Sequence, residues 1–122
     1  MTLKTAARTF SVKGLDQSKL VGQKEAFKIC LEFFDGVAKL KRQNTSDGSY
    51  GLKHIIENPT GRFAIPYSAD SYNGYIYEGT CILAALASGF AMEQDGEHLK
   101  VSFNISRPSL RQRAKEFAHR ES

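Results

Sequence analysis

The longest apolar run in the chain spans residues 81–87 and contains no charged side chain. Asn73 precedes it at a position suited to an N-cap, and Glu78 lies early, where the helix dipole favours a carboxylate. Gly89 follows the run and suits the left-handed residue just past a helix end. These signals predict a helix over about 74–88.

Both sides of this predicted helix are apolar or small. Leu83, Leu86 and Phe90 recur at helical spacing on one side, while small residues, among them Thr80 and Ala84, form a ridge on another. We therefore expect the helix to be buried on most of its circumference and to form the centre of the core. The apolar run is too short to span a membrane, which needs roughly 20 residues.

Two segments before the central helix also have helical periodicity. In residues 23–42 apolar side chains recur at intervals of three and four, and Gly36 is expected to mark close packing or a bend. A basic last turn would suit the helix dipole. A shorter helix is predicted from Ser49 to Asn58, where Pro59 ends it. The basic residues of the first helix's last turn are Lys39, Lys41 and Arg42.

The C-terminal segment has the pattern of a basic amphipathic helix that ends near His119. Ser106 is a suitable N-cap, and Pro108 fits the first turn. The narrow apolar stripe contains Leu110 and Phe117, and cationic side chains occupy much of the remaining surface. Such a helix either docks on its own domain or contacts phosphates.

Strands are predicted where the period of the pattern changes to two. Residues 90–94 and 98–105 alternate on either side of an Asp-Gly pair, which is a strong hairpin signal. An isolated hairpin is marginal, so its apolar face should pack on a helix or a further strand. Residues 9–12 and 62–65 are short strand candidates, and Gly14 suggests a turn. The predicted class is α+β, with a small helical core.

Size and composition indicate an ordinary globular chain. With 122 residues, 41% hydrophobic and 25% charged, we expect one domain over residues 1–122, with ends at about 1–18 and 119–122 as candidates for flexibility. No sustained apolar stretch at the N-terminus resembles a signal peptide. Cys30 and Cys81 fit reduced core thiols in a cytoplasmic protein, with a disulfide as the alternative. Their spacing gives no zinc signature, so neither a metal nor a cofactor is expected.

Charge is distributed unevenly along the chain. Residues 1–43 carry nine Lys or Arg and four Asp or Glu. Residues 44–106 carry three basic and seven acidic residues, and residues 107–122 carry five basic and two acidic residues. If the two basic ends share a face, they form an electrostatic patch; otherwise they are a solvated surface.

Aromatic residues gather in the connection before the central helix. Four of the five tyrosines lie within eleven positions there. Tyrosine is enriched at recognition surfaces because it joins a rigid apolar body to a hydrogen-bonding tip. The alternative is that these rings cap the core helix. The candidate partner-binding residues are Tyr67, Asp70, Tyr72, Tyr75, Tyr77 and Glu78.

Candidate catalytic chemistry is sparse. His54 and Glu57 stand three apart on one predicted helix and can share a face, but acid–base catalysis needs a pocket and a third orienting group. No glycine loop matches a phosphate cradle, and no serine lies in a nucleophile elbow. We therefore do not expect an enzyme.

Three strings of the chain, SYGLKHIIE, YIYEGTCILAALASGF and VSFNIS, are similar to a pattern in small uncharacterised proteins of plasmids, integrative elements and phages. The match covers about 49–106. In that pattern an Asn tends to precede the helix glycine, where this chain has Glu78. The resemblance implies an accessory protein of a mobile element, and implies no activity or site residues.

Three hypotheses follow. The first is a non-enzymatic binding protein of a mobile element that covers a surface on a host protein or ribonucleoprotein complex, as anti-CRISPR proteins and other anti-defence inhibitors do. The second is a nucleic-acid-binding or regulatory module, and the third is a small enzyme that uses His54 and Glu57. No membrane partner is expected, and oligomeric state stays open. The phosphate contacts of the second hypothesis would be Lys39, Lys41, Arg42, Arg107, Arg111, Arg113, Lys115 and Arg120.

Overall fold

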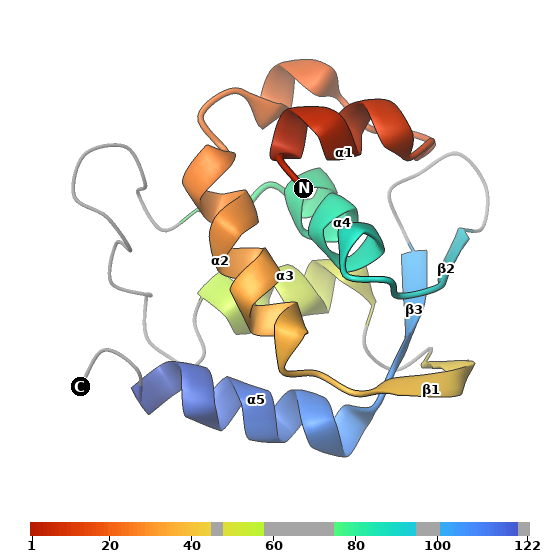
Figure 1. The fold of residues 1–122 in the computed structure, drawn as a ribbon, viewed down its shortest axis with the longest axis vertical. Helices are drawn as coiled ribbons and strands as arrows, with labels where there is room; N and C mark the ends of the chain where they lie inside the picture. Colours follow the sequence, from red (N-terminus) through yellow and green to blue (C-terminus); the bar gives the residue numbers. More distant parts are fainter. Residues whose placement is uncertain (45–47, 58–74, 95–100, 120–122) are drawn as a thin grey trace.

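The computed structural model describes residues 1–44, 48–57, 75–94 and 101–119, which form helices around a small antiparallel sheet. The expected α+β class is confirmed (Figure 1). The elements, in chain order, are α1 (Leu3–Thr9), the 3-10 helix η1 (Gln17–Leu20), α2 (Lys24–Asp35), β1 (Lys39–Asn44), α3 (Ser49–Glu57), α4 (Glu78–Ala87), β2 (Met92–Gln94), β3 (Val101–Ile105) and α5 (Arg107–His119).

The central helix of the core is α4, as the apolar run predicts. Residues 79–85 are all buried, and α4 packs most extensively against α2 and also against α1 and α3. The helix begins at Glu78, later than expected, because Tyr77 has extended backbone at the N-cap. Gly89 has a φ of 91° and ends the helix as predicted. Asn73 and Gly74 lie outside the described residues.

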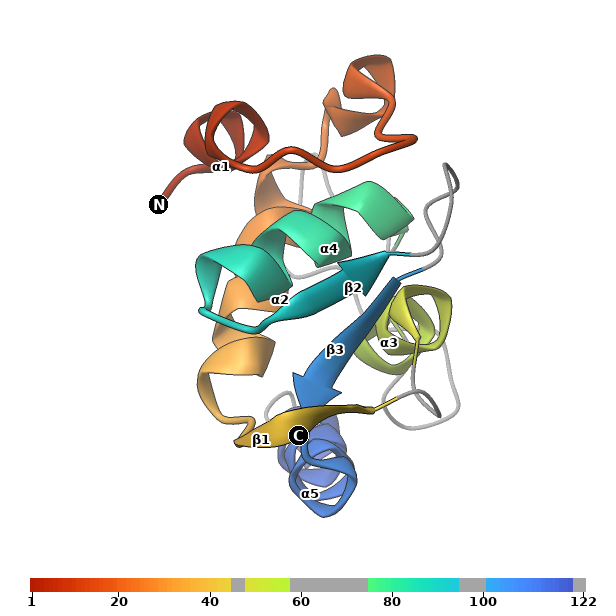
Figure 2. The same cartoon turned by 90° about the vertical axis from the view of Figure 1, so that its right-hand side faces the viewer.

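The sheet has β3 at its centre, with β1 and β2 as antiparallel neighbours (Figure 2). The predicted hairpin is confirmed, with Met92 opposite Phe103, whereas its Asp-Gly turn lies outside the described residues. Along β3 buried residues alternate with half-buried ones, so one face of the strand belongs to the core. The hairpin is thereby supported by both a third strand and the helices, as its marginal stability alone requires.

The helix predicted over 23–42 is wrong in its second half. It ends at Asp35, Gly36 is its C-cap, and residues 39–44 form β1. Lys39 lies opposite Ile105 in the sheet, so the basic segment is an edge strand rather than a helix end. The free edge of β3 provides backbone partners that a continued helix would leave unused, and this long-range pairing overrides the local periodicity.

The strand predicted at residues 9–12 is also wrong. Thr9 is instead the last residue of α1, and residues 10–12 belong to no helix or strand. The first turn of α1 is capped by Thr2, with the Thr5 N–H donating to the Thr2 hydroxyl oxygen at 3.1 Å. This helix packs on α4. The expected turn is present, with Gly14 at a φ of 80°. Downstream, the Gln94 side chain binds both the N–H and the C=O of Lys13, at 3.1 and 2.7 Å, and fastens the N-terminal segment to β2.

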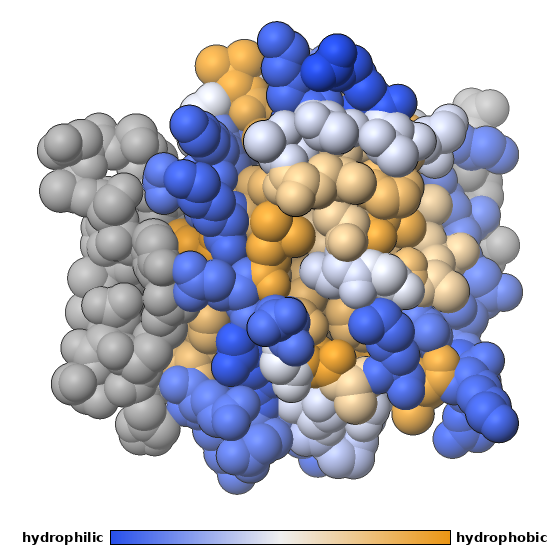
Figure 3. All heavy atoms as spheres, viewed as in Figure 1, coloured by the Kyte–Doolittle hydropathy of each residue, from blue (hydrophilic) through white to orange (hydrophobic). Residues whose placement is uncertain are grey.

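One face of the molecule shows apolar side chains gathered at its centre (Figure 3). Leu31 on α2 and Leu86 and Ala87 on α4 are only partly buried and pack against the core.

No helix in the described ranges is long and apolar enough to cross a membrane.

The two cysteines lie in the core as free thiols, on α2 and α4, as predicted. Burial raises the pKa of Cys30 well above its usual range, and a hydrogen bond with the Cys81 thiol adds to the effect. Because the thiolate is the reactive form, the native Cys30 is expected to be inert.

We predict that thiol reagents at pH 8 label the native protein only as fast as it opens, but label it at once in denaturant. The free energy of unfolding should also fall as pH rises above about 8.5, because the unfolded chain then loses the Cys30 proton and the native state keeps it. A Cys30→Ala variant should show a smaller decline. Rapid labelling of the native protein would contradict the buried placement.

Two helical glycines predict opposite effects of the same substitution. A Cβ at Gly79 would collide with the side chains of Leu15 and Tyr77, whereas a Cβ at Gly51 would meet nothing within 4 Å. Gly79→Ala should therefore lower the free energy of unfolding by about 1–3 kcal/mol. Gly51→Ala should raise it by about 0.5–1 kcal/mol through helix propensity. Urea denaturation measures both, and equal effects would refute the packing at Gly79.

Candidate functional site

The segment of residues 75–77 leads into α4 with extended backbone at Tyr77, and no strand among the described residues pairs with it. Extended backbone directs its polar groups alternately to two sides. On one side, the Gln23 amide replaces a neighbouring strand. Its Oε1 accepts from the Tyr77 N–H at 2.8 Å and its Nε2 donates to the Tyr75 carbonyl at 3.3 Å.

On the other side, two side chains of α3 bind both backbone groups of Ile76. Lys53 Nζ donates to the Ile76 carbonyl at 2.9 Å, and the Ile76 N–H donates to Glu57 Oε2 at 2.5 Å. Lys53 Nζ and Glu57 Oε2 lie 3.9 Å apart, and both residues are buried. We call Gln23, Lys53 and Glu57 the backbone clamp. It satisfies groups whose burial without partners would cost about 1–3 kcal/mol each.

The spacing of α3 explains how one helix makes these contacts. Ser49, Lys53 and Glu57 are four residues apart, so they share one side of the helix. The Ser49 hydroxyl donates to Glu78 Oε2 at 2.5 Å and extends the contact into the first turn of α4. Leu52 and Ile56, each one residue earlier than a clamp residue, are buried in the core beside them.

Exposed rings lie over the clamp. Tyr50, His54 and Tyr75 have 61%, 50% and 51% of their surface exposed, the value for His54 being that of its side chain. The Tyr50 and His54 rings meet edge to face at 4.4 Å, and Lys53 Nζ lies 4.6 Å from the centre of the Tyr75 ring. His54 Nδ1 is 3.2 Å from Glu57 Oε1, so this pair shares a face as predicted. We call Tyr50, His54 and Tyr75 the aromatic cluster.

The predicted partner-binding residues are thus distributed differently from the expectation. Tyr75 is half exposed, whereas Tyr77 is buried and its hydroxyl accepts from the Asp16 N–H at 3.0 Å. Tyr77 therefore holds the N-terminal segment and offers no exposed ring. Glu78 is half-buried against Ser49. Tyr67, Asp70 and Tyr72 lie outside the described residues.

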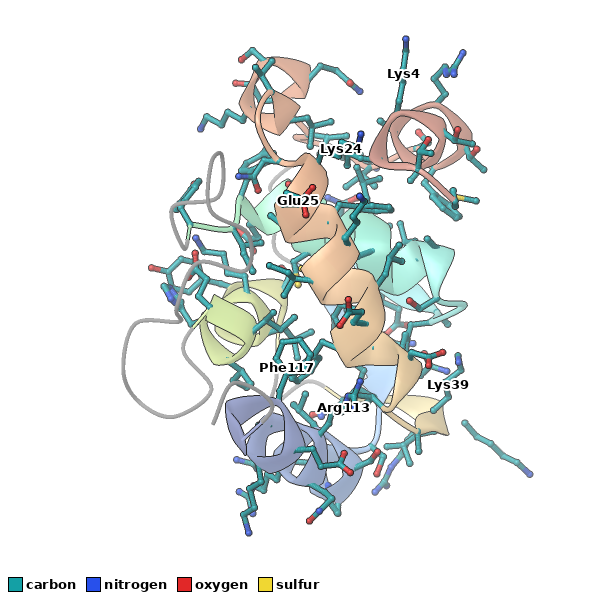
Figure 4. All side chains as sticks on the ribbon, turned by 60° about the vertical axis from the view of Figure 1, so that its left-hand side comes forward. Lys4, Lys24, Glu25, Lys39, Arg113 and Phe117 are labelled. Carbon is teal, nitrogen blue, oxygen red and sulfur yellow. The ribbon has the colours of Figure 1, made fainter. Side chains whose placement is uncertain are left out.

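Arg113, a predicted phosphate contact, instead caps a helix. Its Nε donates to the Phe33 carbonyl at 3.0 Å and its guanidinium also donates to the Glu32 carbonyl, both at the C-terminal end of α2 (Figure 4). This end is where a helix leaves carbonyls unpaired and favours a cation. Gly36 leaves room for it, since a Cβ there would lie 2.6 Å from Nε. The close packing expected at Gly36 is therefore confirmed.

The other predicted phosphate contacts lie on two elements. Lys39 Nζ lies 4.6 Å from the centre of the Phe90 ring, which engages this cation in a local contact. Arg120 lies outside the described residues. The other predicted phosphate contacts are all exposed: Lys41, Arg42, Arg107, Arg111 and Lys115.

Sequence patterns did not single out Gln23, Lys53 or Tyr50. The signal in the sequence is the spacing of four residues between the polar residues of α3, which form a stripe beside the apolar one. This polar stripe is a second buried side of the helix.

Across the described parts of the chain, no three His, Cys, Asp or Glu residues gather as a metal site. Searches against family models, curated proteins and solved structures find no match.

The clamp predicts unequal effects of two substitutions at one position. Glu57→Ala should lower the free energy of unfolding by about 3 kcal/mol or more, because it leaves the buried Lys53 ammonium without its counter-charge and the Ile76 N–H without its acceptor. Glu57→Gln keeps an acceptor for Ile76 and should cost less. Chemical denaturation measures the difference, and hydrogen exchange of the Ile76 amide should speed up far more in the alanine variant.

His54→Ala is the matched control, since His54 contacts the same carboxylate from an exposed position. It should change stability by less than about 1 kcal/mol. Equal losses for Glu57→Ala and His54→Ala would show that the clamp does not hold the segment.

Proposed function

We propose that this chain is a non-enzymatic binding protein that occupies a surface on a host protein or ribonucleoprotein complex through its aromatic cluster. In its specific form, it is a cytoplasmic accessory protein of a mobile genetic element that inhibits a host defence system, as anti-CRISPR proteins do. The observation that carries the proposal is the group of three half-exposed rings mounted on the backbone clamp.

The backbone clamp supports recognition because it fixes the positions of the rings before any partner binds. Tyr75 belongs to a segment whose neighbouring backbone groups are bound on both sides, and Tyr50 and His54 stand on a helix anchored by the same clamp. Rings held in this way lose little conformational freedom on binding, which favours affinity. Tyrosines at the centre of an interface frequently act as hot spots.

The link to mobile elements rests on the resemblance. Two of its strings, residues 49–57 and 75–90, contain most of the clamp, the whole aromatic cluster and α4. The shared pattern is therefore the part of the chain that builds the proposed surface.

The test is quantitative capture of host proteins by tagged wild-type protein and by a Tyr50→Ser/Tyr75→Ser variant. We expect a discrete host protein or complex to bind the wild type, and the variant to bind it at least about 30-fold more weakly, as the loss of a hot spot of 2 kcal/mol or more implies. Inhibition of the captured complex would support the specific form.

Val21→Ser is the matched control, because Val21 is 84% exposed and lies outside the cluster. It should bind as the wild type does. Unchanged circular dichroism and urea denaturation of the double variant exclude a folding defect. Equal capture by all three proteins, or no captured host protein at micromolar concentration, would refute the proposal.

A further inference from the structure

The tertiary structure places the two basic segments of the chain end to end. β1 and α5 lie along one edge of the molecule (Figures 1 and 2). The register of the sheet explains this, because Lys39 lies opposite Ile105 and α5 begins two residues later, at Arg107. The two elements that carry these cations therefore follow one another along that edge, although more than sixty residues separate them in sequence.

β1 and the described part of α5 carry few anionic side chains of their own. Within β1 and the described part of α5 the only carboxylate is Glu116, which lies 3.7 Å from Arg113. Arg113 and Lys39 already have local roles, as a helix cap and above the Phe90 ring. Besides these two, β1 and the described part of α5 carry five exposed cations, which we call the basic band: Lys41, Arg42, Arg107, Arg111 and Lys115.

On α5 the band is a regular row. Arg107, Arg111 and Lys115 are four residues apart, so they share one exposed side and follow one another at steps of about 6 Å. Leu110 and Phe117 occupy the buried side of the same helix. The helix thus presents cations in a line, away from the core.

The position of Arg107 argues against a role of this side chain in helix stability. Arg107 is in the first turn of α5, which contains no acidic residue, and the helix dipole disfavours cations there. Charges on an edge strand commonly prevent aggregation, which accounts for Lys41 and Arg42 but not for the row on α5.

We propose that the basic band binds the phosphate backbone of a nucleic acid, independently of base sequence. A linear array of cations matches a linear polyanion, whose binding releases condensed counterions. The band uses residues other than the aromatic cluster, so this inference goes beyond the proposed function and can fail separately from it.

The test is fluorescence anisotropy with labelled 30-nucleotide single strands and duplexes of two unrelated sequences, titrated between 50 and 300 mM salt. For five contacts, log K should fall with log salt at a slope of about −4.5 for duplex and −3.5 for single strands. An Arg111→Gln/Lys115→Gln variant should weaken binding to both sequences equally and flatten the slope by about 2.

Lys4→Gln/Lys24→Gln is the matched control, because it removes the same charge from exposed positions at the opposite end of the molecule from Arg113 (Figure 4). It should leave affinity and slope nearly unchanged. Urea denaturation confirms that both variants are folded. The proposal is overturned by a flat salt response, by equal weakening in both variants, or by binding to poly-glutamate without binding to any nucleic acid.

Discussion

The fold depends on a stretch of buried backbone that has no neighbouring strand. Ile76 and Tyr77 are buried just before α4, and their backbone polar groups must be paired because burial removes them from water. Gln23 on one side and Lys53 with Glu57 on the other supply the missing partners. These side chains join α2, α3 and the entry to α4, so the three helices that enclose the core are tied together at one point by polar contacts.

Side chains also pair with backbone groups at several other places where regular structure ends. Arg113 caps the carbonyls of α2, and Gln94 pairs with the backbone of Lys13. In the sheet, the Asn104 amide accepts from the Ala91 N–H at 2.7 Å and donates to the Leu40 carbonyl at 2.9 Å, where the β1–β3 register shifts. A chain with short elements has many unpaired backbone groups at their ends, and long polar side chains satisfy them here.

This use of polar side chains decides which residues are left for binding. Lys53, Tyr77 and Arg113 have the chemistry of recognition residues but are committed to backbone contacts or packing. The residues that remain exposed divide into a group of rings above the clamp and a row of cations along α5 and β1. Tyr50, His54 and the cations lie on helices or strands, whereas Tyr75 lies on the segment that the clamp holds. The two surfaces differ in the partner chemistry that they suit.

The sequence by itself determined the elements whose signals are local. The uncharged run at 81–87 predicted the buried central helix, and the alternation of apolar and polar residues predicted the β2–β3 hairpin. An N-cap residue followed by an amphipathic pattern predicted α5. These signals suffice because capping, periodicity and burial act within a few residues. It also placed Tyr75 and the exposed cations of α5 among the binding candidates.

Only the tertiary structure decided the rest. Residues 39–44 pair as a strand because β3 offers a free edge, and Tyr77 is buried because Asp16 and Gly79 pack around it. The clamp joins residues more than fifty positions apart, so no local pattern contains it. Hydrogen bonding and exposure of this kind depend on which distant groups meet, and that is a property of the folded chain alone.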